Sequence, residues 1–181
     1  QGSLSNVEGL EISNTAGTST TFNATGASGL EYLFLDANDE SFIFDALSDT
    51  DLTFELEDAD SVNPSNISSA VPTLSYQLNF GTDVNDNEDD SLTLILNDVG
   101  RRNVSQGRPD DGVAVIATDI ENLTIVAQGQ QNYIDLLPLA DTKSITIGGE
   151  GELDTLTFNN AFNNGTGGDQ TPFTSLSSVN A

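Results

Sequence analysis

A pattern of about 22 residues recurs along the chain and limits the folds it can adopt. Each copy opens with an apolar residue followed by Asn or Asp, continues through a small polar turn, and closes with a strand of alternating apolar residues. Three copies are nearly in register: Phe22-Asn23 with 30–35, Phe44-Asp45 with 52–56, and Ile134-Asp135 with 144–147. A repeat of this length is typical of stacked supersecondary units, each of which packs on its neighbours.

Two strand types alternate within the pattern, and equivalent strands are evenly spaced. The interval from Leu10 to Leu33 and the interval from Leu123 to Ile145 both match the length of the repeat. The spacing favours an all-β parallel β-solenoid, of the β-helix or β-roll kind, with about 20–23 residues per coil. The alternative is an antiparallel β-sandwich, which would show turns about every 8–12 residues and no longer period.

We expect residues 1–181 to form a single domain, a piece of a longer chain, with inserted loops near 57–73 and 97–112. Helical periodicity is weak throughout. Period-two runs predict strands at 7–13, 20–24, 31–35, 42–46, 52–56, 75–80, 91–96, 113–117, 122–126, 133–136, 144–147 and 155–158.

The charge balance is strongly acidic, with 29 Asp and Glu against four basic residues and a formal net charge of −25. This disfavours nucleic acid and anionic lipid as partners, and no apolar run is long enough for membrane insertion. Divalent cations are the natural counter-charge, although acidity can equally serve solubility alone. Cysteine, histidine, methionine and tryptophan are absent, so neither disulfides nor thiolate metal sites contribute.

The densest group of oxygen ligands lies at 83–90. Calcium takes about six to eight oxygen ligands, and alternate side chains in such a loop can converge on one ion. The loop is not an EF-hand, because Leu94 stands where the bidentate Glu would be. A solvated acidic hairpin tip is the alternative. The candidate calcium ligands here are Asp83, Asn85, Asp86, Asn87, Asp89 and Asp90.

A second candidate calcium site lies in residues 148–158, which come close to the Gly-Gly-x-Gly-x-Asp nonapeptide of β-rolls. Its candidate ligands are Gly149, Gly151 and Asp154, with one residue too many before the Asp. By contrast, we expect the repeated Asn23, Asp45 and Asp135 to be structural, either as a side-chain ladder or through Asx turns.

The residues do not favour an enzyme. No histidine is available as a base or metal ligand, and carboxylates are so abundant that no single pair is informative. Three of the four basic residues are Arg101, Arg102 and Arg108, on one expected loop. The simplest role for that loop is binding a neighbouring acidic surface.

The units at 7–12, 120–125 and 154–158 resemble the coils of bacterial calcium-dependent surface-layer proteins and RTX-type adhesins. That resemblance implies export from a Gram-negative cell by a type I system, and folding outside the cell in calcium. It implies a structural, self-assembling module of a cell-surface layer or extracellular filament. The rival hypothesis is an adhesin module that binds a cell-surface glycan or a protein ligand through its inserted loops.

Overall fold

The computed structural model describes residues 7–13, 18–27, 29–36, 40–47, 51–59, 74–81, 89–103, 108–111, 113–117, 120–136, 142–151, 153, 155–156 and 178–180. Within these ranges the structure is all-β, and every regular element is a strand. No helix in the described part is long and apolar enough to cross a membrane.

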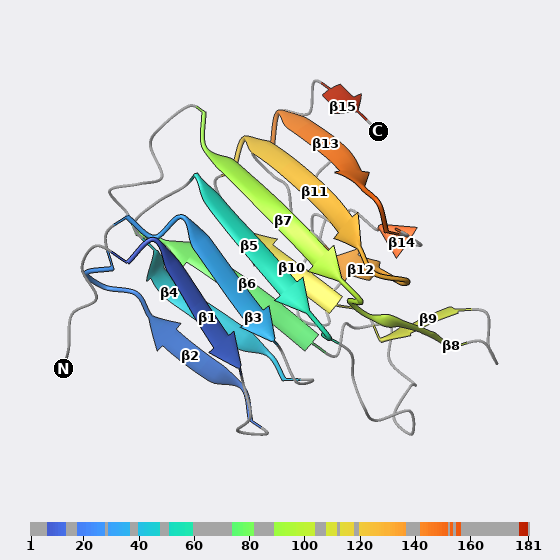
Figure 1. The fold of residues 1–181 in the computed structure, drawn as a ribbon, viewed down its shortest axis with the longest axis horizontal. Coiled ribbons are helices and arrows are strands. Elements are labelled where there is room, and N and C mark those ends of the chain that lie inside the picture. Colours follow the sequence, from blue (N-terminus) through green and yellow to red (C-terminus); the bar gives the residue numbers. More distant parts are fainter. Residues whose placement is uncertain are drawn as a thin grey trace, which may run out of the picture.

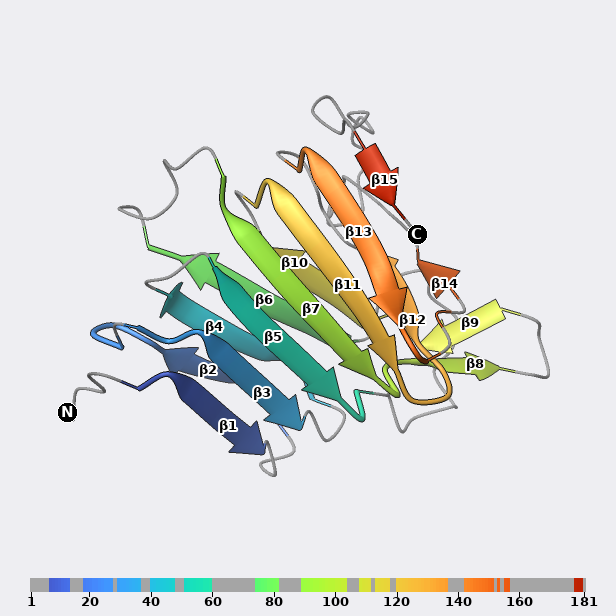
Figure 2. The same cartoon turned by 45° about the horizontal axis from the view of Figure 1, so that its top comes forward.

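Two large sheets form the fold, and successive strands along the chain alternate between them over most of its length (Figure 1). The seven-stranded sheet has the order β1 (Gly9–Ser13), β3 (Tyr32–Asp36), β5 (Leu52–Glu57), β7 (Ser91–Asn97), β11 (Asn122–Gln128), β13 (Ser144–Gly149) and β15 (Ser178–Asn180). The six-stranded sheet has the order β14 (Thr155–Leu156), β12 (Tyr133–Leu136), β10 (Val113–Ala117), β6 (Leu74–Phe80), β4 (Phe42–Leu47) and β2 (Thr20–Asn23). Figure 2 shows the two sheets as separate layers.

Every pairing described within the two large sheets is parallel, so the antiparallel alternative is wrong for them. The repeat seen in the sequence is the strand register: Phe22 pairs with Phe44, and Asn23 pairs with Asp45. Because like residues stack on like, the apolar rows continue from strand to strand with the same side-chain orientation in most pairings. The register shifts in two pairings of the six-stranded sheet, between Phe44 and Leu47 of β4 against β6 and between Val113 and Ala114 of β10 against β12.

The repeat length of about 20–23 residues holds from β1 to β5 and from β11 to β13. It fails in the middle of the seven-stranded sheet and again at its end, where Ser144 of β13 pairs with Ser178 of β15. The interval from Phe54 to its partner Leu94 is nearly two repeats, and the interval from Leu94 to Ile125 is well over one. The second of these intervals contains a hairpin that the period-two pattern did not predict, β8 (Arg101–Asn103) and β9 (Arg108–Asp111). It is antiparallel, and its two strands form a separate sheet.

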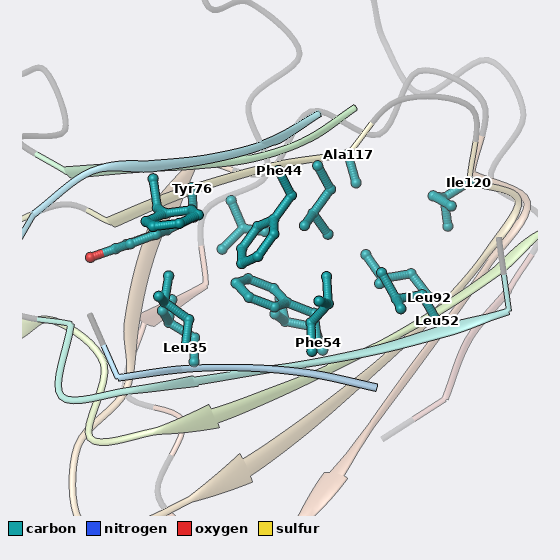
Figure 3. Packing of buried hydrophobic residues seen from close by; sticks show 14 of the residues in the cluster. Leu35, Phe44, Leu52, Phe54, Tyr76, Leu92, Ala117 and Ile120 are labelled. Atoms are coloured by element: carbon teal, nitrogen blue, oxygen red, sulfur yellow. The ribbon is translucent and has the colours of Figure 1, made fainter. Parts of the chain in front are cut away.

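The core lies between the two sheets, where one face of each buries an apolar row (Figure 3). Phe44 of β4 meets Phe54 of β5 across the layers, with ring centroids 5.6 Å apart in an edge-to-face arrangement. Strands β5, β6 and β7 alternate strictly between buried and half-buried residues. This alternation is the period-two pattern of the sequence, with its apolar side turned inward.

Polar residues form ladders away from the core. Thr53, Thr93, Thr124 and Thr146 occupy one register position on four adjacent strands of the seven-stranded sheet. In the other sheet, Asn79 donates a hydrogen bond to Asp45, with 3.4 Å between Nδ2 and Oδ1. The side chain of Asn23 accepts a hydrogen bond from the backbone N–H of Thr25 at 2.9 Å, which is an Asx turn. These contacts support the structural roles expected for Asn23 and Asp45, whereas the side chain of Asp135 lies outside the described part.

Candidate functional site

Most of the first candidate calcium site lies outside the described residues. Asp83, Asn85, Asp86 and Asn87 belong to that part of the chain, and so does Asp154 of the second site. Asp89 is exposed and Asp90 is buried just before β7. The N–H of Asp90 donates to Glu121 Oε2 at 3.1 Å, and its carbonyl accepts the backbone N–H of Asn122 at 2.9 Å. Asp90 therefore aligns the start of β7 with the start of β11.

The glycines of the second candidate site lie where β13 passes very close to β11. Gly149 has a φ of 113°, and a Cβ placed there would come within 2.0 Å of the Ala127 carbonyl oxygen. A Cβ on Gly151 would come within 2.4 Å of the Gln128 carbonyl carbon, and the Gly151 N–H donates to the Ala127 carbonyl at 3.0 Å. Gly149 and Gly151 thus have a steric reason to be glycine that needs no ion, whereas nothing lies within 4 Å of a Cβ placed on Gly148.

Among the described residues, no group of three or more Asp or Glu side chains is arranged to hold a metal ion. Acidic side chains nonetheless gather at one place, the end of strands β3, β5 and β7. We call Asp36, Glu57, Asp58 and Asp98 the acidic rim. Asp36 and Glu57 are direct partners in the β3–β5 register, and Glu57 is the partner of Asn97 in β7.

Hydrogen bonds within the protein hold part of the acidic rim. Asn97 Nδ2 donates to Glu57 Oε1 at 2.9 Å, and Ser13 Oγ donates to Asp36 Oδ2 at 3.4 Å. Burial raises the pKa of Glu57, and the negative charges of Asp58, Glu55, Asp36 and Asp98 raise it further. A cation near these side chains would favour the ionised form of Glu57.

The rim ends in a turn that repeats on adjacent strands. Asp58, Asp98 and Gly129 follow β5, β7 and β11 directly, and their φ angles are 48°, 55° and 71°. Asp98 Oδ1 accepts the backbone N–H of Gln130 at 2.7 Å, so this carboxylate braces the next turn. A Cβ on Gly129 would lie 2.6 Å from that same oxygen, which explains glycine there. Asp98 therefore has a structural role.

A hollow of about 530 Å³ opens on the outer face of strands β1, β3 and β5. It is lined by Gly9, Leu10, Glu11, Tyr32, Phe34 and Glu55. Phe34 lies between two carboxylates, since its register partners are Glu11 on β1 and Glu55 on β5. Tyr32 is 36% exposed and is the one large hydrophobic side chain exposed among the described residues.

Gly9 and Glu55 fix the surroundings of the Tyr32 ring. Gly9 is the register partner of Tyr32 and has no side chain to cover the ring. The Tyr32 hydroxyl donates a hydrogen bond to Glu55 Oε2. Burial, this hydrogen bond and the charges of Glu55, Glu11 and Glu57 raise the pKa of Tyr32 to about 12, so the hydroxyl stays protonated. The hollow combines aromatic surface with negative charge.

The sequence signals for the hollow were weak. Tyr32 and Phe34 fit an alternating strand, and Glu11 and Glu55 fit ordinary solvent-facing positions. Only the cross-strand register brings the four residues together, because they come from three strands separated by a full repeat each. The signal that could have identified the hollow is Gly9, a glycine within a strand, which marks a place where something approaches closely.

Comparison of the chain with protein-family models, with curated proteins and with solved structures finds no match in any of the three.

Proposed function

We propose that this chain is a parallel β-solenoid that serves as a structural, self-assembling module of a bacterial cell-surface layer or extracellular filament, ordered by calcium. The alternation of strands between two parallel sheets supports the solenoid, since each repeat contributes one strand to each sheet. The in-register stacking of apolar rows supports it as well.

One observation carries the assembly proposal: among the residues that the structure describes, the apolar core is incompletely covered at the β1–β2 end. Leu10, Ile12 and Phe22 are only half-buried, although they occupy the same rows as Leu33, Leu35 and Phe44, which are 0% exposed. A capped solenoid would end in a polar face. Strands β1 and β2 are also edge strands of their sheets, and an edge strand is a template for pairing with another chain.

The strong negative charge of the chain is the reason for including calcium in the proposal. Copies of a chain with a net charge of −25 repel each other, and the acidic rim adds local repulsion that already raises the pKa of Glu57. Bound or bridging calcium would reduce both effects. An export route in which the chain folds only outside the cell, as in a type I system, would couple assembly to external calcium.

Light scattering in millimolar calcium and in EDTA tests this function. The proposal predicts large, concentration-dependent assemblies in calcium, and smaller species with a lower unfolding temperature in EDTA. A chain that stays monomeric in both conditions contradicts the assembly function. An unfolding temperature indifferent to EDTA contradicts the role of calcium.

The rival proposal is an adhesin module that holds a glycan or protein ligand near 57–73 or 97–112. The β8–β9 hairpin belongs to the second of these segments and extends beside the sheets (Figures 1 and 2). Persistent monomers that bind a glycan array would favour this alternative. We propose no enzymatic activity for either case.

A further inference from the structure

The further inference concerns the hollow formed by Tyr32, Phe34, Glu11 and Glu55, and it rests on the proposed assembly function. We infer that this hollow receives an arginine side chain from the β8–β9 hairpin of a second copy of the chain. Such a contact would join copies sideways, in addition to any contact at the open β1–β2 end.

The lining of the hollow favours an organic cation. Cations bind over the faces of aromatic rings, and arginine does so more often than lysine. Glu11 and Glu55 flank Phe34 on both sides, and a planar guanidinium can donate hydrogen bonds to a carboxylate while it stacks on a ring. A neutral sugar could also stack on Tyr32 and donate hydroxyl hydrogen bonds to Glu11 or Glu55, but it would leave their negative charge uncompensated. The hydrogen bond from Tyr32 also holds the Glu55 carboxylate in place before a ligand arrives.

The chain offers guanidinium groups in one small region. Its only arginines are at positions 101, 102 and 108, and all three belong to the β8–β9 hairpin. Across the hairpin Arg101 is paired with Asp111, whereas Arg102 is paired with Pro109 and Arg108 with Asn103. Arg102 and Arg108 therefore have uncharged register partners, and they are the two that we assign to the contact.

The contact must form between copies. Both views place β8 and β9 beyond the ends of β7 and β11, away from β1 (Figures 1 and 2). A hairpin on one copy and a hollow on the next are different surfaces, so the contact is heterologous and can continue from copy to copy. A sideways contact of this kind would convert a row of stacked copies into a layer.

Site-specific crosslinking tests the contact directly, because the chain has no native cysteine. Thr53→Cys places a thiol beside Tyr32, its register partner, and Asn103→Cys places one opposite Arg108. The two single-cysteine proteins are mixed in calcium with a short bismaleimide, and the crosslinked dimer is quantified on a denaturing gel. The inference predicts a dimer from the mixture that is at least about fivefold more abundant than from either protein alone.

Matched variants show whether the dimer depends on the inferred groups. Arg102→Ala with Arg108→Ala in the hairpin protein, or Glu55→Gln in the hollow protein, should each lower the dimer yield about tenfold. Glu55→Gln keeps an acceptor for the Tyr32 hydroxyl and so preserves the fold. The controls are Arg101→Ala and Glu31→Gln, which remove one charge each from the same regions and should leave the yield nearly unchanged. Equal effects of the control and test variants would overturn the inference.

A second measurement separates this inference from the proposed function. If wild-type protein assembles in calcium but the crosslink does not form, the inference is wrong and the assembly function stands. If wild-type protein stays monomeric, the assembly function and the inferred contact between two copies are both wrong. Backbone NMR shifts at Gly9, Glu11 and Tyr32 during titration with N-acetylarginine methylamide then report whether the hollow binds a guanidinium. Shifts with methyl glucoside instead would assign the hollow to a glycan and overturn the inference.

Discussion

Gly149 occupies a backbone position that no other residue can adopt without moving its neighbours. Its φ of 113° is strained for any residue with a side chain, and an added Cβ would also come within 2.0 Å of the Ala127 oxygen. The sequence motif Gly-Gly-x-Gly predicts a calcium site here, and that site stays a prediction. What the structure shows at Gly149 and Gly151 is close backbone packing. The glycines alone cannot distinguish these two causes, because both need a backbone without side chains.

Gly149→Ala should therefore destabilise the fold by about 2 kcal/mol or more, through left-handed backbone strain and collision with β11. Chemical denaturation monitored by circular dichroism measures the loss. Gly148→Ala is the matched control, because nothing lies within 4 Å of its added Cβ and its φ is not in the left-handed region. Equal stability of the two variants would contradict the steric explanation.

Glu57 in the acidic rim makes stability depend on pH. A carboxyl whose pKa is higher in the folded than in the unfolded state binds more protons when folded, so stability falls as pH rises above its ordinary value of 4.5. Glu57→Gln should stabilise the protein at pH 7 by a few tenths of a kcal/mol, since Asp36 lies directly opposite. The gain should shrink as pH falls toward 4.5, through the raised pKa of the folded state, and should be largely absent at lower pH.

Thermal unfolding of both proteins across this pH range measures the difference. The hydrogen bond from Asn97 is retained, because Gln also offers an acceptor oxygen. Glu8→Gln, which removes one charge at the opposite end of the strands, controls for the lower net charge. If Glu57→Gln stabilises the protein no more than Glu8→Gln does, then repulsion among the acidic rim residues does not destabilise the fold.

At the level of elements, most strands could be predicted from period-two patterns, and the repeat predicted their parallel stacking. The short strand β15 at the C-terminal end is not among the predicted strands. Strands such as β5, β7 and β11 have buried residues at alternate positions, which a sequence displays directly. The β8–β9 hairpin was not predicted, because Arg-Arg-Asn and Arg-Pro-Asp-Asp contain no apolar alternation. Hydrophobic periodicity therefore gives no signal there.

Asn132 joins the ends of three strands, and no pattern in the sequence singles it out. It is fully buried between β11 and β12; its Oδ1 accepts the Val99 N–H at 3.2 Å, and its Nδ2 donates to the Gln128 carbonyl at 2.7 Å. Asn132→Ala should cost about 2 kcal/mol, because two backbone groups lose their partner. Urea denaturation measures this cost.

The neighbouring Gln131 provides the comparison for Asn132. Its side chain is exposed, and Gln131→Ala should change the free energy of unfolding by less than about 0.5 kcal/mol. A comparable loss in both variants would indicate that the hydrogen bonds of Asn132 do not stabilise the turn.

For the whole molecule, the number of residues between neighbouring strands of one sheet could be predicted only where no extra segment interrupts the repeat. The interval from Phe80 to Leu96 is too short for a full repeat because these residues belong to β6 and β7, which lie in different sheets. The sequence pattern cannot assign a strand to a sheet once insertions change the interval. The candidate calcium ligands at 83–87 and Asp154 remain predictions, since they lie outside the described residues.

The half-buried row at the β1–β2 end makes the assembly proposal testable by a single substitution. Ile12→Lys places a charge in the open core row and on an edge strand, which opposes pairing with another chain. Ser13→Lys adds the same charge to the adjacent exposed position of the same strand. The two variants differ in which face of β1 carries the lysine.

Sedimentation velocity of the wild type and these two variants in millimolar calcium tests the central claim most directly. The proposal predicts rapidly sedimenting assemblies for the wild type and for Ser13→Lys, and a folded protein of much lower mass for Ile12→Lys. A wild type that sediments as a monomer at every calcium concentration, or an Ile12→Lys protein that assembles like the wild type, would contradict it.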